Sequence, residues 1–130
     1  MHKEYSYEEG EYMSQEISNL LQDYVTEIRK IYGTHLKQVI LYGSYARGDF
    51  NADSDVDIML LVDLPEERLN SFSDELSELV FAYNVTYGIW FMPIVKNIEH
   101  FKYWRQAYPF YSNVEKEGIS LYEAPELLQN

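Results

Sequence analysis

The stretch Ile40-LYGSYARGDFNADSDVDIMLL-Val62 decides the fold and contains most of the polar residues that we single out for chemistry. It opens with an apolar run typical of a strand, turns at Gly43-Ser44, and enters a second apolar run at Asp55 and Asp57. Two carboxylates one residue apart on a strand point to the same face, with Cα atoms roughly 6.5–7 Å apart at about 3.3 Å rise per residue. Such a pair can hold divalent cations, and the Gly-Ser turn can direct backbone N–H groups at a phosphate. The pattern therefore indicates metal-dependent chemistry on a nucleotide phosphate.

The charge balance limits the classes of partner. The chain has 130 residues, 46% of them hydrophobic, and a formal net charge of −12 at pH 7. This hydrophobic share is ordinary for a globular protein. Affinity for a nucleic-acid backbone comes from clustered Lys and Arg, so we expect no direct nucleic-acid binding. A phosphate-bearing substrate would need Mg²⁺ and local N–H groups to offset the negative charge.

Targeting signals are not apparent in the sequence. Residues 1–9 contain no apolar segment of the kind that a signal peptide needs. No run approaches the roughly 18 apolar residues of a membrane span. The chain has no cysteine, which excludes disulfides and thiolate metal sites. We therefore expect a cytoplasmic protein that does not associate with a membrane.

The periodicity of apolar residues predicts an α/β (α+β) fold, with a small mixed β-sheet and helices packed on it. Residues 1–13 are interpreted as a flexible N-terminal arm and residues 14–130 as a single domain. The three-four spacing after Ser14 predicts a helix that ends near Gly33. The later elements expected are strands at 36–42, 56–62, 85–95 and 118–122, a short helical turn at 44–48, and helices that begin at Leu64-Pro65, Asn97 and Pro109.

Five residues of the central stretch are candidates for the site. Asp55 and Asp57 are the candidate catalytic and metal-ligating carboxylates, since Mg²⁺ prefers carboxylate and phosphate oxygens. Gly43 lets the backbone approach a phosphate without a Cβ in the way, and Ser44 adds a hydroxyl. Arg47 has two interpretations: it contacts a phosphate, or it pairs with the nearby Asp49 or Asp53.

These residues resemble a known family. Gly43-Ser44, ten further residues and Asp55-Val56-Asp57 resemble the signature of the polymerase-beta-like nucleotidyltransferase superfamily. The string around Leu41–Asp49 and the tail Pro109-FYSNVEKEGISL-Tyr122 are similar to its minimal nucleotidyltransferase (MNT) branch. The resemblance extends over residues 36–122.

The resemblance implies the nucleotidyltransferase fold and a Mg²⁺-dependent transfer of AMP from ATP to an acceptor hydroxyl. In the MNT branch the protein is often the antitoxin of a HEPN ribonuclease toxin, and the acceptor is a tyrosine of that toxin. The resemblance assigns the triphosphate to Gly43 and Ser44 and the metals to Asp55 and Asp57. The acceptor surface would come from this partner or from a second copy of the chain, because 130 residues leave no room for a further domain.

One departure from the family keeps two alternatives open. Active members commonly carry a third acidic residue on a later strand, and residues 85–95 contain none. Glu115 and Glu117 are remote substitutes. The alternatives are a small-molecule enzyme of the aminoglycoside type, whose cationic acceptor would suit the negative charge, and a binding module that neutralises its partner by contact alone.

An aromatic run, Phe101-KYWRQAYPF-Tyr111, lies near the C-terminus. Half of its rings are expected in the core at helical spacing. The others are candidates for an interface, where Tyr, Trp and Arg are enriched.

Overall fold

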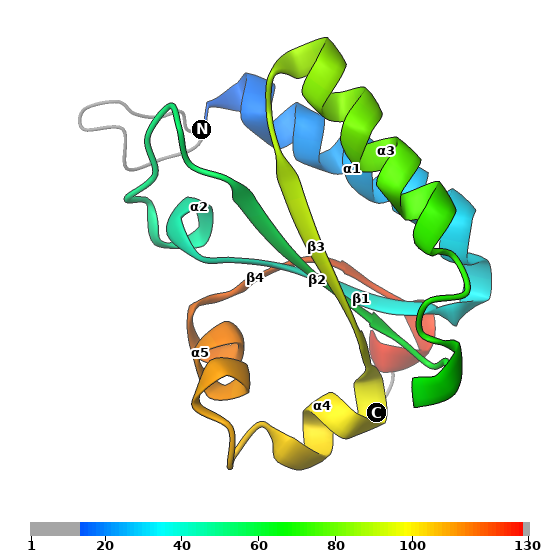
Figure 1. The fold of residues 1–130 in the computed structure, drawn as a ribbon. Helices are drawn as coiled ribbons and strands as arrows, with labels where there is room; N and C mark the ends of the chain where they lie inside the picture. Colours follow the sequence, from blue (N-terminus) through cyan, green and yellow to red (C-terminus); the bar gives the residue numbers. More distant parts are fainter. Residues whose placement is uncertain (1–13, 129–130) are drawn as a thin grey trace.

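The computed structural model describes residues 14–128, and its centre is one four-stranded sheet with the strand order β3-β2-β1-β4 (Figure 1). β1 pairs antiparallel with β2 and β4, whereas β2 pairs parallel with β3. The sheet is therefore mixed, as predicted. Its strands are β1 (Leu36–Tyr42), β2 (Val56–Val62), β3 (Phe91–Asn97) and β4 (Ile119–Glu123).

Helices cover both faces of this sheet. α1 and α3 lie side by side on one face, and α4 and α5 lie on the other (Figure 1). The short α2 follows β1 directly at the end of the sheet where β2 begins (Figure 1). The helices are α1 (Gln15–Tyr32), α2 (Ser44–Arg47), α3 (Ser73–Tyr87), α4 (Ile98–Trp104) and α5 (Pro109–Glu117), with 3₁₀ turns at Gly33–His35, Glu66–Arg68 and Pro125–Leu128.

β2 is buried on both faces, which explains its nearly continuous apolar sequence. Ile58, Leu60 and Val62 belong to the core under α1 and α3. Met59 and Leu61 belong to the core under α4 and α5. Because side chains alternate along a strand, Asp57 lies on the same face as Met59, toward α4 and α5.

The ends of α1 agree with the prediction. The hydroxyl of Ser14 accepts a hydrogen bond from the amide of Ile17, and the helix stops at Gly33, whose φ is 59°. The buried side of the helix contributes large residues to the main core: Leu21, Tyr24, Val25, Ile28 and Tyr32.

Two predicted boundaries are wrong. The strand expected at 85–95 is β3 at Phe91–Asn97, and residues 85–87 form the last turn of α3. Gly88, with φ of 71°, ends that helix in the left-handed conformation. A glycine at this position favours a helix end, but the residues before it, Val85-Thr-Tyr, have the composition of a strand. The helix expected from Leu64-Pro65 forms only a 3₁₀ turn there, and α3 begins at Ser73.

β3 is an edge strand of the sheet, which accommodates Pro93 because proline has no N–H to donate to a neighbouring strand. The predicted arm at 1–13 lies outside the described residues. Within residues 14–128, none of the helices has the length and apolar character needed to cross a membrane.

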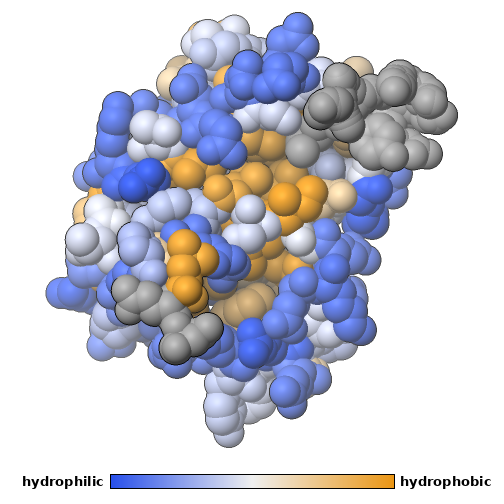
Figure 2. Space-filling view, turned by 180° about the vertical axis from the view of Figure 1, so that it is seen from behind, coloured by the Kyte–Doolittle hydropathy of each residue, from blue (hydrophilic) through white to orange (hydrophobic). Residues whose placement is uncertain are grey.

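Hydrophobic residues also reach the surface. On the face turned away from the viewer of Figure 1, they gather in the middle and are surrounded by hydrophilic residues (Figure 2). Clustered exposed apolar groups are a feature of interaction surfaces.

Candidate functional site

A cleft of about 500 Å³ opens where β1 ends and β2 begins. All five predicted site residues line it, together with side chains from α5. The complete lining is Tyr42, Gly43, Ser44, Arg47, Ser54, Asp55, Asp57, Phe110, Asn113, Val114 and Glu117.

Gly43 is required at its position for two independent reasons. Its φ of 76° lies in the region that L-residues rarely adopt, and it opens α2 directly after β1. A Cβ built on Gly43 would lie 2.3 Å from Oδ2 of Asp57, much closer than non-bonded atoms approach. The carboxylate of Asp57 therefore packs against the backbone of the turn, which joins the phosphate-binding and metal-binding parts of the predicted motif.

The carboxylate of Asp57 lies in an electrostatically unfavourable environment. Partial burial raises the pKa of Asp57 above its ordinary value, and the neighbouring Asp55 raises it further, whereas Arg47 lowers it. Tyr42, which is paired with Asp57 in the β1–β2 register, has its pKa raised to about 12 by burial and by Asp57. A cation placed between the two carboxylates would relieve this repulsion.

Arg47 forms one of the ion pairs predicted for it, with Asp49, whereas its contact with a phosphate stays a prediction. Its Nε donates to Oδ2 of Asp49 at 3.1 Å, and its Nη1 donates to Oε1 of Glu117 at 3.5 Å. These bonds raise the pKa of Arg47. A guanidinium has five N–H donors in a planar fork, so the two contacts leave donors for a phosphate.

One side of the cleft is formed by α5, and the sequence did not predict this arrangement. Phe110, Asn113, Val114 and Glu117 follow the i, i+3, i+4, i+7 spacing of one helix face, and that face lines the cleft. The spacing is visible in the sequence, but nothing in it shows that α5 packs against β1. Of the two remote substitutes for a third acid, Glu117 lies in the cleft, whereas Glu115 pairs with Arg105 at 2.9 Å.

β3 contributes no acid beside the pair. The β2–β3 register sets Met92 beside Asp57, and Met92 is exposed. Among residues 14–128 no group of three or more His, Cys, Asp or Glu side chains is close enough to hold a metal. Asp55 and Asp57 nevertheless suit Mg²⁺, which commonly takes one or two carboxylates and completes its shell with water and substrate phosphates.

The comparison with known families identifies the class. The family described as "Nucleotidyltransferase domain" matches residues 21–119, and the chain belongs to this family. The resemblance to nucleotidyltransferases stated from the sequence is thereby confirmed. Two proteins of Methanocaldococcus jannaschii with the name "Putative protein adenylyltransferase" are similar to this chain. MJ0604 is 31% identical over 102 residues, which cover 78% of this chain and 94% of MJ0604. MJ0141 is 34% identical over 80 residues, which cover 62% of this chain and 79% of MJ0141.

Solved structures share the fold. One is a crystal structure of a toxin–antitoxin with AMP-PNP, with a TM-score of 0.51, 18% identity, and coverage of 81% of this chain and 75% of that chain. A mutant of the toxin–antitoxin MntA-HpeT matches with the same TM-score and coverage at 16% identity. At these identities the likeness concerns the fold, and it confirms the predicted nucleotidyltransferase architecture.

Proposed function

We propose that this protein transfers AMP from ATP, with Mg²⁺, to a tyrosine hydroxyl of a partner protein, as the antitoxin of a HEPN-type ribonuclease toxin. The observation that carries the proposal is the cleft in which Gly43 and Ser44 face Asp55 and Asp57. Membership of the nucleotidyltransferase family supports the transfer. The names of the Methanocaldococcus jannaschii relatives support a protein acceptor, and the toxin–antitoxin neighbours support the setting.

Each site residue has a role in this proposal. Asp55 and Asp57 hold the metal, which neutralises charge that develops on the phosphates. The Gly43-Ser44 turn and Ser44 hydroxyl bind phosphate oxygens. Arg47 supplies positive charge at the same end of the cleft, held in place by Asp49 and Glu117.

The proposed reaction is a single displacement. The acceptor hydroxyl oxygen forms a bond to the α-phosphorus of ATP, and the bond from that phosphorus to the oxygen bridging to the β-phosphate breaks. Pyrophosphate leaves, and the hydroxyl proton passes to solvent. Positioning and charge neutralisation account for most of the catalysis in such reactions, so a dedicated base from β3 is not a requirement.

The test uses the full chain, ATP, Mg²⁺ and the protein encoded by the adjacent reading frame. We expect intact-mass spectrometry to show one or more AMP units on that partner, and peptide mapping to place them on tyrosine. An unchanged mass of the partner, with both proteins folded, would contradict the proposal. Transfer to an aminoglycoside instead would support the small-molecule alternative.

A binding module is the second candidate, favoured by the absence of an acid from β3 and by the hydrophobic surface in Figure 2. A toxicity assay separates the two candidates. If the partner inhibits growth, Asp55→Asn and Asp57→Asn variants should fail to protect cells when protection needs transfer. Full protection by both variants would support the binding module.

A further inference from the structure

The cleft has two walls, which come from different parts of the chain. One wall is the motif, which supplies the turn, the arginine and the two carboxylates. The opposite wall is the face of α5 formed by Phe110, Asn113, Val114 and Glu117. If the triphosphate and metal occupy the motif wall, the nucleoside must lie on what remains of the lining.

The α5 wall has the chemistry of a base-binding surface. Phe110 is 42% exposed although it lines the cleft, and its ring is supported edge-on by Tyr42, with centroids 5.6 Å apart at 78°. Apart from Tyr42, the side chains that β1, α2 and β2 contribute to the cleft are small or polar. The flat apolar surface that a nucleobase needs is therefore found at Phe110 and Tyr42.

Packing fixes α5 relative to the motif. A Cβ on Gly118 would meet the backbone oxygen of Val114 at 2.4 Å and Cγ2 of Ile40 at 2.5 Å. The end of α5 thus lies directly against β1, the strand that leads into Gly43. β4 follows at once and pairs with β1, with Ile119 opposite Leu41. The α5 wall cannot slide along the cleft without breaking these contacts.

The two ends of the α5 wall differ in chemistry. Glu117 contacts Arg47, which marks the end near the phosphates. Phe110 lies seven residues earlier, a rise of about 10 Å along the helix. This span is comparable with that from a purine base to its 5′-phosphates, so the base end falls at Phe110. Asn113 lies between the two and is exposed.

We propose that α5 carries the base subsite of the nucleotide, in which an adenine ring stacks on Phe110 and is recognised by the amide of Asn113. An Asn side chain can accept from the 6-amino group of adenine and donate to its N7 at the same time. The assignment rests on the proposed function, because it takes the triphosphate to lie at Gly43, Ser44 and Arg47. To that proposed function the base subsite adds a means of selecting adenine, because none of the side chains at Gly43, Ser44 and Arg47 offers an aromatic surface on which a base could stack.

The test compares binding of ATP with binding of inorganic tripolyphosphate, each with Mg²⁺, by calorimetry on the full chain. Phe110→Ala should weaken ATP binding on the order of 10-fold or more, since a stacked base is lost, and leave tripolyphosphate binding unchanged. Tyr103→Ala is the matched control, because Tyr103 is an aromatic residue of α4 that is 75% exposed and does not line the cleft. It should bind both ligands like the wild type.

Base selection is tested separately with inosine triphosphate, in which an oxygen replaces the 6-amino group. The wild type should bind ATP more tightly than inosine triphosphate, and Asn113→Ala should lose that preference. If Phe110→Ala does not fold, Phe110→Leu keeps the apolar volume, removes the flat ring and should show the same selective loss.

The outcomes distinguish the inference from the function on which it rests. Unchanged ATP affinity in the Phe110 variants, or an equal loss for both ligands, would overturn the base subsite and leave the phosphate site standing. Unchanged ATP affinity with a raised KM for the acceptor would instead assign the α5 wall to the acceptor. Failure of the wild type to bind either ligand would overturn both proposals.

Discussion

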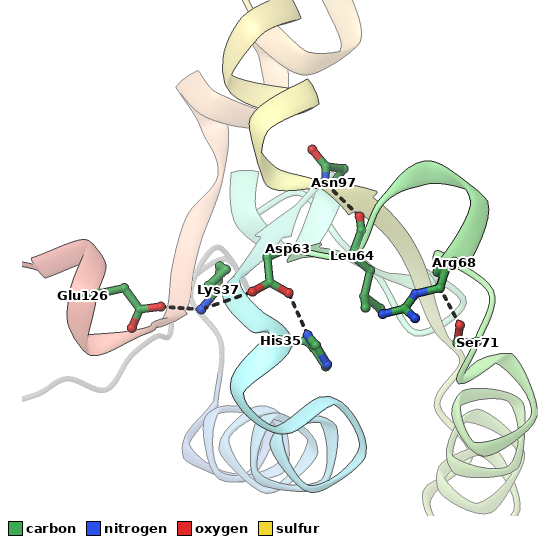
Figure 3. A network of polar contacts seen from close by, with 8 residues as sticks. All are labelled: His35, Lys37, Asp63, Leu64, Arg68, Ser71, Asn97 and Glu126. Atoms are coloured by element: carbon green, nitrogen blue, oxygen red, sulfur yellow. Dashed lines mark hydrogen bonds and ion pairs between the residues drawn. The ribbon is translucent and has the colours of Figure 1, made fainter.

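The two ends of β2 carry aspartates in opposite circumstances. Asp55 and Asp57 lie at its beginning, in the cleft, and form no ion pair with any side chain of residues 14–128. Asp63 follows its last residue, and Figure 3 shows this carboxylate between His35 and Lys37.

The pairing at Asp63 is extensive. One oxygen is 2.8 Å from Nδ1 of His35, and the other is 3.6 Å from Nζ of Lys37, which also binds Glu126 (Figure 3). This network ties the start of β1, the end of β2 and the C-terminal turn together. Nearby, Asn97 caps α4 and donates to the backbone oxygen of Leu64 (Figure 3).

The difference separates carboxylates that pair within the fold from those to which the proposed function assigns the metal. Carboxylates that the fold pairs with its own cations are satisfied, and those at the cleft are held close together with a raised pKa on Asp57. A second cavity of about 450 Å³ lies beside the Asp63 network, and its lining includes Lys37 and Glu126. The following experiments test the contrast.

The largest expected effect is on catalysis at the cleft end. Asp55→Asn or Asp57→Asn should lower AMP transfer by about 100-fold or more, because metal binding supplies several kcal/mol of charge stabilisation in such reactions. The rate of pyrophosphate release with partner present measures the effect. Asp63→Asn, at the other end of the same strand, should keep a rate close to that of the wild type. If Asp63→Asn lowered the rate of AMP transfer as much as the cleft variants do, the two ends of β2 would not differ in function.

A pair of glycine substitutions separates backbone strain from the site. Gly43→Ala and Gly88→Ala both place a side chain at φ above 70°, which costs about 1–2 kcal/mol of stability. Only the Cβ at position 43 meets Asp57, whereas the one at 88 meets nothing within 4 Å. In urea unfolding, backbone strain should lower the stability of both variants by a similar amount, and the clash with Asp57 should lower that of Gly43→Ala further. Only Gly43→Ala should lose ATP and Mg²⁺ binding. Intact binding in Gly43→Ala would contradict the close packing of the turn on Asp57.

The raised pKa of Asp57 predicts a pH-dependent effect on stability. Since the folded pKa lies above the unfolded value, ionisation of Asp57 destabilises the folded chain as pH rises through the folded pKa. Without Mg²⁺, Asp57→Asn should therefore raise Tm by a few degrees at neutral pH. The difference should shrink as pH falls below the unfolded value of 3.8 and vanish by about pH 2, where Asp57 is protonated in both the folded and the unfolded state. Thermal melts across pH measure it, and a lower Tm for the variant at neutral pH would show that Asp57 is stabilised by a partner.

The smallest effect is expected in the paired network. Hydrogen bonding to Lys37 lowers the pKa of Glu126, and the bond to Glu126 raises that of Lys37. Their contribution is thus present between the ordinary values of 4.5 and 10.5, and it is lost below and above that window. Glu126→Gln should change Tm only slightly, because the Glu126 side chain is 54% exposed, and a pair with one exposed partner is screened by solvent and salt. A large decrease that persists in high salt would mean that the network matters more than its exposure suggests.

The sequence was most informative where local chemistry determines the structure. The Gly-Ser turn, the aspartate pair and the two apolar runs predicted β1, α2 and β2 at the boundaries that the structure shows. The cap at Ser14 and the stop at Gly33 were predicted for the same reason. The error at residues 85–95 arose because β-branched and aromatic residues fit a strand, whereas α3 continues through the exposed Val85 and ends only at Gly88.

The sequence by itself determined the Gly43-Ser44 turn and the placement of Asp55 and Asp57 at the start of β2, because glycine and the alternation of side chains along a strand act locally. Only the tertiary structure decided what faces them. The contact of α5 with β1 places Phe110, Asn113 and Glu117 across the cleft, and the β2–β3 register sets Met92 beside Asp57. Both are long-range contacts that depend on how complementary surfaces pack, and packing is not encoded in any local pattern.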